Sequence, residues 1–463
     1  MAYRYGKREQ YSLLPACIDD YVGPDDPVRA YDAFVEALDL SDLGIEEDTD
    51  QVGNPSYDPR TMLKLFVYGY SYSHDRSSRK LERAANHNLS FIWLLGGLRP
   101  DHKTIANFRK NNKGPLEKVL KQSARMCLRL GLIEGNVLFI DGTKIRANAS
   151  IRHTLDAKRC EKILKNTDKR IEAILAECEE GDSDSLVKLR DELSDKRALR
   201  EKMQAIMLDL KKEGRKSINT TDNDCVSTKG IHGSYAGYNA QIAVDEKNGL
   251  IASCDVSRSS VDYGLLSNQV NQANQTLGKI CSFAVADAGY SDLEDISKIA
   301  DDLTVLVPVQ RQTDDQFIYN KASDTYRCPE GHLLTRYTID HDEQRTRYKI
   351  SSRGLCRRCS RFGICTKSKV GRRISRSLFE ETSQRLANAL RDTEAMKIYK
   401  KRSQKVELPF GHFRRTMGVR SFLLRGLDGA KAEMSLFGSA FNIRRMITLL
   451  GGVQSFITAL SVS

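Results

Sequence analysis

The sequence predicts a mixed α/β domain that is preceded by an all-helical region. Two short apolar runs, at 137–140 and 282–286, are typical of buried strands, and each is followed by an aspartate, Asp141 and Asp287. Residues 1–130 instead carry apolar side chains at three- and four-residue spacing, which is typical of helices. The 463 residues suffice for roughly three domains with a large buried core.

Residues 1–130 contain short helical segments separated by tight turns. The turn Arg99-Pro100-Asp101 precedes one of them, and Asp101 or Thr104 is expected to cap the helix that follows. Basic side chains lie nearby: Arg76, Arg79, Lys80, Arg83, Lys103, Arg109 and Lys110. Short helices with basic side chains suit a helix-turn-helix-like DNA-binding domain, and an ordinary helical bundle is the alternative.

Between and after the two aspartates, helical and strand patterns alternate. Residues 151–215 are strongly charged with two apolar stripes, which predicts a helical hairpin that serves as a spacer or brace. Residues 238–258 predict two strands around a turn, and 262–278 predict a helix. A short helix and a strand at 304–309 follow the second aspartate.

The C-terminal part begins with an irregular, basic segment. Residues 310–375 show no clear periodicity, and a long helix is expected over 378–406. The apolar stretch 446–462 is short and contains two glycines, so a packed helix is expected there rather than a membrane span. The first residues show no apolar core of a secretory signal, and a cytoplasmic protein without membrane contact is expected.

The excess of positive charge lies in one stretch of the chain. The net charge is +12, but residues 353–425 hold 20 Lys and Arg against 5 Asp and Glu, which is +15 and leaves 12 − 15 = −3 for the rest. Such a patch attracts polyanions because its cations neutralise phosphates and release counterions. Nucleic acid is therefore favoured as a partner over the alternative of a merely solvated basic surface.

A cysteine cluster lies partly in the same stretch. Eleven cysteines in 463 residues are too few for a disulfide scaffold, so clustered thiols favour metal binding. The Cys-x2-Cys pair and its neighbours suit a structural Zn²⁺ site. The expected ligands are Cys328, Cys356, Cys359 and Cys365, with His332 as an alternate. Unligated thiols are the other possibility.

The order of predicted elements resembles that of an RNase H-like domain: a strand with an acid, two strands, a helix, a strand with an acid, a helix, a strand, and a helix with an acid. Such a domain would span 131–463, interrupted by the 151–215 hairpin and the 310–375 cysteine-bearing segment. It implies a third acid on the last helix, where Glu407 is the best candidate. Other acids in this part are Glu380, Glu381, Glu394 and Glu433. Structural roles, or roles in support of the metal ligands, are expected for Asp222, Asp224 and Asp245.

Several blocks resemble a bacterial insertion-sequence transposase of the DDE class. FIDGTKIRANAS, YAGYNAQIAVD, VADAGYSD and YKKRSQKVELPFGHFRRTMGVRSFLLRGL resemble the catalytic blocks, in order. DPRTMLKLFVYGY and LRPDHKTIANFR resemble the N-terminal helical DNA-binding region of one subgroup. The family signature Tyr-x2-Arg-x3-Glu-x6-Lys is here Tyr399-x2-Arg402-x4-Glu407-x6-Arg414, which is one residue longer and keeps the last charge.

The resemblance implies a DNA transposase that cleaves element ends with water and then joins their 3′-hydroxyl groups to target DNA. Asp141, Asp287 and Glu407 would hold two Mg²⁺ ions, with Mn²⁺ able to substitute. Residues expected to position the phosphate backbone are Tyr399, Lys400, Lys401, Arg402, Lys405, Arg414 and Arg415.

The implied partners are double-stranded DNA, as terminal inverted repeats and as target, and further copies of the chain in a homodimer or higher oligomer. Two alternatives stay open. One is an RNase H-like nuclease without strand transfer, and the other is a non-catalytic DNA-binding regulator derived from a transposase.

Overall fold

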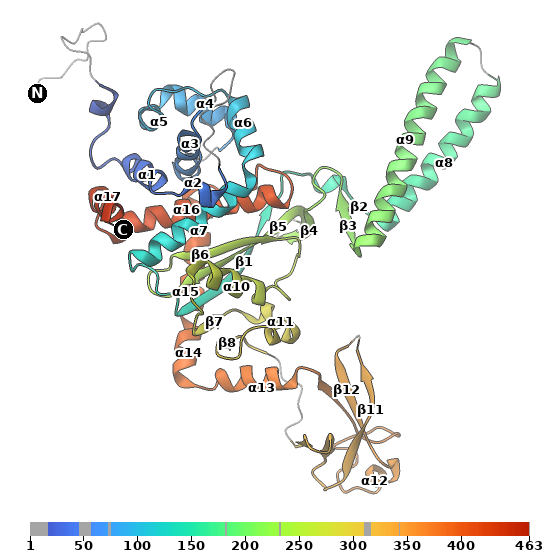
Figure 1. Ribbon diagram of the computed structural model, residues 1–463. Coiled ribbons are helices and arrows are strands. Elements are labelled where there is room, and N and C mark those ends of the chain that lie inside the picture. The colour runs from blue at the N-terminus through green and yellow to red at the C-terminus, as the bar shows by residue number, and fades with distance from the viewer. Residues whose placement is uncertain are drawn as a thin grey trace, which may run out of the picture. The chain divides into compact units, whose positions relative to one another are not determined.

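A computed structural model describes residues 17–45, 57–72, 76–180, 183–230, 233–309, 316–341 and 343–462 (Figure 1). The chain forms two compact units. The first comprises Met1–Asp262, Gln272–Ile280 and Gln404–Ser463, and the second comprises Tyr263–Asn271 and Cys281–Ser403. Helices and strands both contribute, so the prediction of a mixed α/β protein is confirmed.

Helices make up the N-terminal part of the first unit. They are α1 (Pro27–Glu36), α2 (Leu40–Leu43), α3 (Pro59–Tyr72), α4 (Ser78–His87), α5 (Leu89–Leu94), α6 (His102–Asn111) and α7 (Lys113–Arg129), after the 3-10 turn η1 (Ile18–Tyr21). Their starts follow local capping rules. Asp101 accepts a hydrogen bond from the Thr104 N–H at 2.7 Å, so Asp101 is the cap of α6.

The helix α16 (Leu427–Leu449) is the central helix of the first unit. Its side chains are buried almost continuously from Gly429 to Ile443, because it contacts α7, α3, α1 and strand β6. Gly438 permits close approach, since a Cβ there would lie 2.9 Å from the Leu120 side chain.

The last helix, α17 (Val453–Val462), is separate from α16. The two are divided at Gly451 and Gly452, which both have positive φ, so the apolar stretch predicted as one helix spans the end of one helix and all of the next. No helix among the described residues is long and apolar enough to span a bilayer.

Three strands of the first unit pair with the long strand β5 (Gly233–Asp245). Strands β1 (Val137–Arg146), β4 (Val226–Gly230) and β6 (Ile251–Ser257) are all antiparallel to it. The turn between β5 and β6 contains Gly249 with φ 66°, and both strands predicted on either side of this turn are confirmed. The register sets Asp141 opposite Ile242 and Gly142 opposite Gln241.

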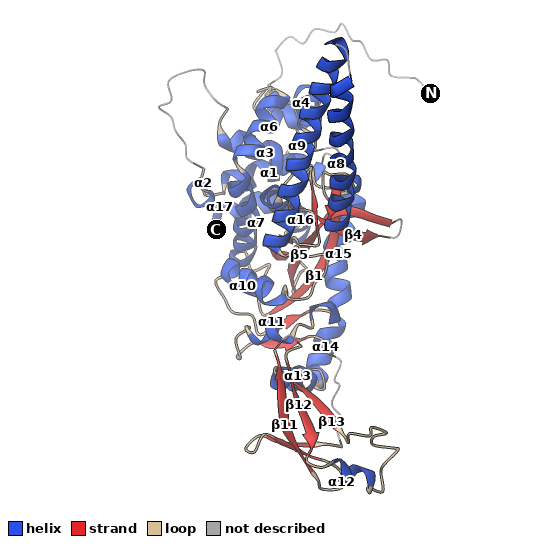
Figure 2. Cartoon of the chain, turned by 90° about the vertical axis from the view of Figure 1, so that its right-hand side faces the viewer, coloured by secondary structure: helices blue, strands red, loops and turns tan. Residues whose placement is uncertain are grey.

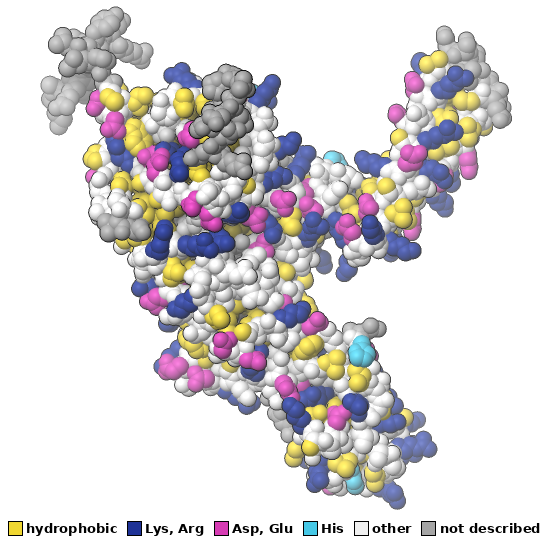
Figure 3. All heavy atoms as spheres, in the orientation of Figure 1, with side chains coloured by type: hydrophobic (Ala, Val, Ile, Leu, Met, Phe, Trp, Pro, Cys, Tyr) yellow, Lys and Arg dark blue, Asp and Glu magenta, His cyan; other side chains and the backbone are white. Residues whose placement is uncertain are grey.

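Two long helices occupy the segment 151–215. The helices α8 (Ala157–Glu180) and α9 (Ser183–Glu213) run side by side, after the turn η2 (Ile151–His153) and between strands β2 (Thr154–Asp156) and β3 (Ser217–Asn219) (Figure 1). Arg170 of α8 makes a two-pronged contact with Glu192 of α9, with both N–O distances 2.9 Å. Acidic and basic side chains are interspersed along the hairpin (Figure 3). Residues 181–182 of the expected turn lie outside the described residues.

The second unit contains a short parallel strand pair, β7 (Phe283–Val285) and β8 (Thr304–Leu306). The turn η3 (Ala288–Tyr290) and the helix α11 (Leu293–Ser297) connect them. The helices α10 (Leu266–Leu277) and α15 (Arg402–Gly411) each have residues in both units.

A second, antiparallel sheet occupies most of the segment that the sequence predicted to be irregular (Figure 2). Its strands are β13 (Arg373–Ser377), β12 (Arg345–Ile350), β11 (Leu333–Asp340), β10 (Thr325–Arg327) and β9 (Ile318–Asn320), in that spatial order, with the helix α12 (Arg353–Arg357) beside them. The expectation was wrong because the strands are short and mostly polar; β11 buries only Leu334. Residues 310–315 and 342 lie outside the described part.

The long helix expected over 378–406 is interrupted twice. It consists of α13 (Glu380–Ala389), α14 (Thr393–Lys400) and α15, which continues into the π-helical turn η4 (His412–Thr416). Asp392 starts α14 anew, since its side chain accepts a hydrogen bond from the Ala395 N–H at 2.8 Å.

Candidate active site

Asp141 lies within β1 and is half-buried. The apolar residues before it are buried and hold the strand in the core. Its Oδ1 accepts a hydrogen bond from the N–H of Gly142 at 2.8 Å. Since side chains alternate along a strand, Asp141 and Thr143 point to the same face, with Cα atoms about 7 Å apart.

Glu407 is exposed on α15, whose neighbouring residues Val406, Pro409 and Phe410 are buried. This pattern fixes the helix and leaves the carboxylate at the surface. Further along the same helical segment, the Arg414 guanidinium donates a hydrogen bond to Thr143 Oγ1. The segment that carries Glu407 is therefore joined to β1 two residues after Asp141.

The alternative third acid Glu433 is unsuited to metal binding, because it is fully buried in α16 and accepts backbone hydrogen bonds from Leu423 and Leu424. Glu380 is also buried, at 6% exposure. Glu381 and Glu394 are exposed, like Glu407, and pair with Lys321 and Lys397, so the assignment of Glu407 as the third carboxylate stays a prediction.

Asp287 directly follows the β7 segment and is half-buried. It caps η3, with its Oδ1 accepting a hydrogen bond from the Gly289 N–H at 2.8 Å. Asp287 belongs to the second unit, whereas Asp141 and Glu407 belong to the first. The convergence of the three acids therefore stays a prediction.

A preformed metal site would need several ligands close together. Within the described ranges, no group of three or more His, Cys, Asp or Glu side chains is arranged to hold an ion. The chemistry of the three predicted acids nevertheless suits Mg²⁺, because carboxylate oxygens are the hard ligands that this ion prefers.

The four predicted zinc ligands lie around the small sheet of the second unit. Cys328, Cys356 and Cys365 pack against its apolar cluster, which includes Tyr326 and Tyr348. The sulfurs of Cys328, Cys356 and Cys359 each accept a backbone N–H, at 3.3, 3.5 and 3.4 Å. The four cysteines do not form a preformed group of ligands within the described ranges, and these backbone contacts fit simple thiol burial, so the zinc site, including His332 as alternate, stays a prediction.

A hollow of about 570 Å³ runs along the end of β1 in the first unit. Its wall includes four cations and three aromatic rings: Lys144, Arg146, Arg414 and Arg420, with Tyr235, Phe410 and Phe413. The Arg146 guanidinium lies 4.9 Å from the centre of the Tyr235 ring. A nucleic-acid groove usually combines cations, which contact phosphates, with aromatic rings, on which bases stack.

Of these residues, only Arg414 was predicted from the sequence. Arg146 and Lys144 follow Asp141 along the same strand, so the basic residues of the block KIRA were the available signal. No signal in the sequence indicated Tyr235 and Arg420, since they come from distant parts of the chain and meet only in the fold.

The seven predicted DNA-binding residues are divided between the units. Lys400, Lys401, Arg414 and Arg415 are exposed. Lys405 is half-buried, and its ammonium donates to the Glu246 carbonyl, which fastens α15 to the turn after β5. Tyr399 and Arg402 are half-buried. Contact of these residues with DNA stays a prediction.

Two of the basic residues expected near a helical DNA reader are buried. Arg76 is 5% exposed and Arg109 is 7% exposed. Arg109 donates to the Arg76 carbonyl at 3.1 Å, and Arg76 donates to the Ser421 carbonyl at 3.1 Å. These two side chains therefore hold the helices together rather than lie at the surface, because helical periodicity does not reveal which tertiary partner covers a basic residue. The other five are exposed: Arg79, Lys80, Arg83, Lys103 and Lys110.

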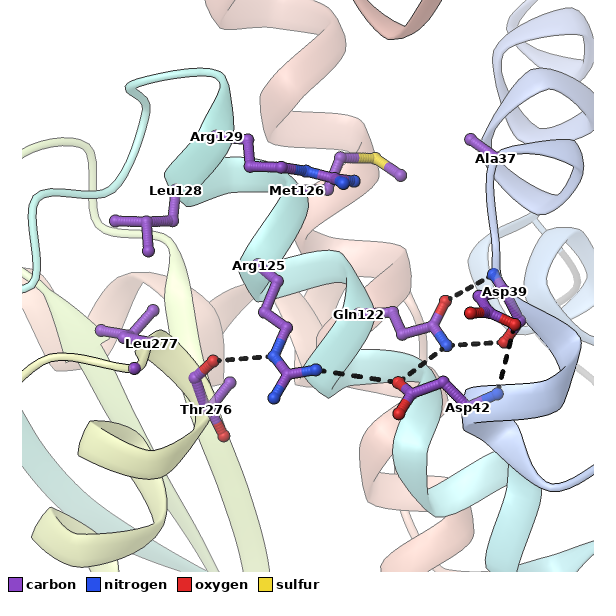
Figure 4. A pocket seen from close by; sticks show the side chains of 11 residues that line it. Ala37, Asp39, Asp42, Gln122, Arg125, Met126, Leu128, Arg129, Thr276 and Leu277 are labelled. Atoms are coloured by element: carbon purple, nitrogen blue, oxygen red, sulfur yellow. Dashed lines mark hydrogen bonds and ion pairs between the residues drawn. The ribbon is translucent and has the colours of Figure 1, made fainter. Parts of the chain in front are cut away.

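A second hollow of the first unit lies between α7, α2 and the end of α10 (Figure 4). Its polar groups pair with one another. Arg125 donates to the Thr276 carbonyl at 3.1 Å, and Gln122 donates to the Asp39 carbonyl at 2.7 Å and to Asp42 at 3.2 Å. These contacts fix three elements together, so a structural role accounts for this hollow.

Three further aspartates fasten loops in the first unit, as expected from the sequence. Asp222 accepts hydrogen bonds from the Tyr238 hydroxyl at 2.7 Å and the Gly426 N–H at 3.2 Å. Asp224 accepts from the Leu427 N–H at 2.8 Å, at the start of α16. Asp245 accepts three backbone N–H groups, and burial raises its pKa above the ordinary value.

Comparison with known proteins gives two family matches. Residues 327–447 match the family described as Transposase DDE domain, and residues 16–111 match the family described as Transposase domain (DUF772). The first match includes Glu407 and Arg414, and the second covers α1 to α6. No curated protein and no solved structure matches the chain. The two matches support an insertion-sequence transposase of the DDE class.

Proposed function

Because both family matches support an insertion-sequence transposase of the DDE class, we propose that this chain binds the ends of an insertion element, cleaves the DNA there by metal-assisted hydrolysis and joins the 3′-hydroxyl ends to target DNA. The observation that carries the proposal is the basic, aromatic-lined hollow beside the strand that bears Asp141. It offers phosphate neutralisation next to a carboxylate of the expected catalytic set.

In this proposal Asp141, Asp287 and Glu407 hold two Mg²⁺ ions. Such ions activate the attacking oxygen and stabilise the leaving oxygen of a phosphodiester. The carboxylates contribute hard oxygen ligands. The hydrogen bond from the Gly142 N–H orients the Asp141 carboxylate.

The cations of the hollow bind and orient the strand that is cut. Arg414 is held against Thr143, so its charge lies beside the strand that carries Asp141. Arg146 and Arg420 extend the positive wall, and the Tyr235 ring gives a surface on which a base can stack. These contacts carry no sequence information, so they serve any DNA that reaches the site.

Recognition of element ends is assigned to the N-terminal helices. The exposed cations Arg79, Lys80 and Arg83 lie on α4, and Lys103 and Lys110 lie on α6. A short helix that enters a groove is the usual means of reading bases. Since two ends must be held for joining, a dimer or higher oligomer on DNA is part of the proposal.

The test is cleavage of labelled duplex that carries the terminal repeat of the element, with Mg²⁺ present. Asp141→Asn, Asp287→Asn and Glu407→Gln should each abolish cleavage while DNA affinity stays within about threefold of wild type, because the ligands act on the reacting phosphate. The matched control is Glu394→Gln, which neutralises an exposed acid on α14. Cleavage at the normal rate by any of the three variants contradicts the assignment of that acid.

A second assay separates a transposase from a nuclease. Pre-cleaved ends with a free 3′-hydroxyl are mixed with supercoiled plasmid, and joined product is measured on a gel. Cleavage of intact ends without joining would reduce the function to that of an RNase H-like nuclease, and binding without either step would leave a DNA-binding regulator.

A further inference from the structure

A polar cluster lies on the sheet face opposite to Asp141. Gly142, Lys144, Asn239 and Gln241 share this face, because Gly142 is opposite Gln241 and Lys144 is opposite Asn239 in the β1–β5 register. Asn239 and Gln241 are fully buried. The cluster is completed by Asp262, which comes from the segment after β6.

The Asp262 carboxylate is the common acceptor of the cluster. Its Oδ1 receives hydrogen bonds from Asn239 Nδ2 at 2.8 Å, Gln241 Nε2 at 2.9 Å and Lys144 Nζ at 3.1 Å. Asn239 Nδ2 also donates to the Val261 carbonyl at 3.2 Å. Two buried amides and an ammonium therefore fix one half-buried carboxylate in a single position.

This carboxylate lies directly against the backbone of Gly142. A Cβ at Gly142 would lie 2.7 Å from Asp262 Oδ1 and 2.2 Å from Gln241 Nε2, so only glycine leaves room for the cluster. The N–H of the same Gly142 donates to Asp141 Oδ1 at 2.8 Å. The position of the Gly142 backbone therefore links the cluster on one face to the acid on the other.

Asp262 also has a particular place in the chain. It is the last residue of the first unit before the chain enters the second unit at Tyr263. The second unit carries Asp287. Lys144, the partner of Asp262, lines the basic hollow. The ion pair fixes the Lys144 ammonium while the segment that leads to the second unit is tied to β1.

We propose that Asp262 is a positioning residue for strand cleavage, which rests on the proposed function. Held by Lys144, Asn239 and Gln241, its carboxylate fixes the Gly142 backbone and thereby the direction of the Asp141 carboxylate. Asp262 acts through its neighbours in this arrangement, because its Oδ1 accepts hydrogen bonds from three donors.

The experiment compares full-length wild type, Asp262→Ala, Asp262→Asn and Gly142→Ala on the labelled terminal-repeat duplex. Four quantities are measured: the single-turnover cleavage rate, the Mg²⁺ concentration at half-maximal rate, the dissociation constant for DNA, and the midpoint of thermal unfolding. Asp262→Ala should cut the rate by about 10- to 100-fold, as expected for a misplaced reacting group. The half-maximal Mg²⁺ concentration should rise several-fold, with the DNA dissociation constant within about twofold of wild type.

Asp262→Asn should recover part of the lost rate, because the amide oxygen can still accept from Asn239 and Gln241. Gly142→Ala should reproduce the Asp262→Ala result, since its Cβ displaces the same groups. The control is Asp168→Ala, which removes an aspartate paired with Arg200 in the hairpin and should behave as wild type.

The outcomes separate this inference from the proposed function. Wild-type cleavage together with a normal rate and Mg²⁺ requirement in Asp262→Ala overturns the positioning role and leaves the proposed function standing. A fall in rate matched by equal losses of DNA affinity and of thermal unfolding midpoint assigns Asp262 a purely structural role and also overturns it. Absence of cleavage by wild type overturns the proposed function, and the inference with it.

Discussion

Replacing Glu433 by Ala should destabilise the first unit strongly. Glu433 lies in α16 with 0% exposure, and its Oε1 accepts the N–H groups of Leu423 and Leu424. Burial raises the pKa of this carboxyl, and the nearby Arg76 and Arg109 charges oppose the rise. The substitution removes the charged acceptor of two backbone groups and takes away a negative charge that faces two buried arginines.

The magnitude follows from these contacts. Leaving two buried backbone N–H groups without their acceptor and two buried arginines without a nearby negative charge costs about 3–5 kcal/mol of unfolding free energy. At roughly 2–4 °C per kcal/mol for a domain of this size, the midpoint of thermal unfolding should fall by about 6–20 °C. Glu433→Gln keeps the shape and one acceptor oxygen, so its destabilisation should be about 1–2 kcal/mol, near that of one hydrogen bond.

The assay is thermal and urea unfolding of the full-length protein, followed by circular dichroism. Glu394→Gln, on the exposed face of α14, is the control and should shift the midpoint by no more than about 1 °C, as is usual for exposed pairs. A destabilisation below about 1 kcal/mol for Glu433→Ala, or an equal one for Glu433→Gln, would refute the reasoning that the buried negative charge holds this region together.

Three further predictions concern other groups. Burial lowers the pKa of His412 below its ordinary value of 6.5, so the unfolded chain takes up the proton first as pH falls. The stability of the wild type should therefore drop below pH 6.5, and that of His412→Gln should drop less steeply. Unfolding midpoints at pH 7.5 and pH 5 measure this difference. Arg146→Ala combined with Arg420→Ala should lower DNA affinity for all sequences and reduce the slope of log K against log salt by about 1 for each phosphate that is no longer neutralised, whereas Lys298→Ala should change neither. If the cysteine cluster holds zinc, elemental analysis should find one ion per chain in wild type and none in Cys356→Ser, and a metal-free wild type would reject the site.

The strands that carry the first two acids could be predicted because their signal is local. Four apolar residues before Asp141 mark a buried strand without reference to any partner, but β1 continues through Asp141 to Arg146, so the end of the strand was not predicted. The same holds for the hairpin at 151–215, where apolar stripes recur at helical spacing over two long segments. The β5–β6 turn could be predicted from Asn248-Gly249, because such a turn requires a residue with positive φ and Gly249 adopts it.

The remaining features depend on contacts between distant residues. Nothing in the local sequence indicates that Arg76 and Arg109 are buried. Phe437 and Ser421, more than 300 residues further along the chain, cover Arg76. The helix predicted over 262–278 begins only at Leu266, so Asp262 lies in the loop before it, and its donors come from two other strands. The small sheet of the second unit was missed since its strands are short and bury few side chains, so the alternation on which strand prediction depends is faint.

The central position of α16 has a consequence for how the protein is made. The apolar faces of α3 and α7 are covered by a helix that begins at Leu427, so about 300 residues must be translated after α7 before these faces can be buried. At typical synthesis rates of 5–20 residues per second, that interval is roughly 15–60 s. During this time the N-terminal helices expose apolar surface to chaperones and proteases. Chains whose translation stops before Leu427 should therefore be degraded, because α3 and α7 never gain the helix that covers them.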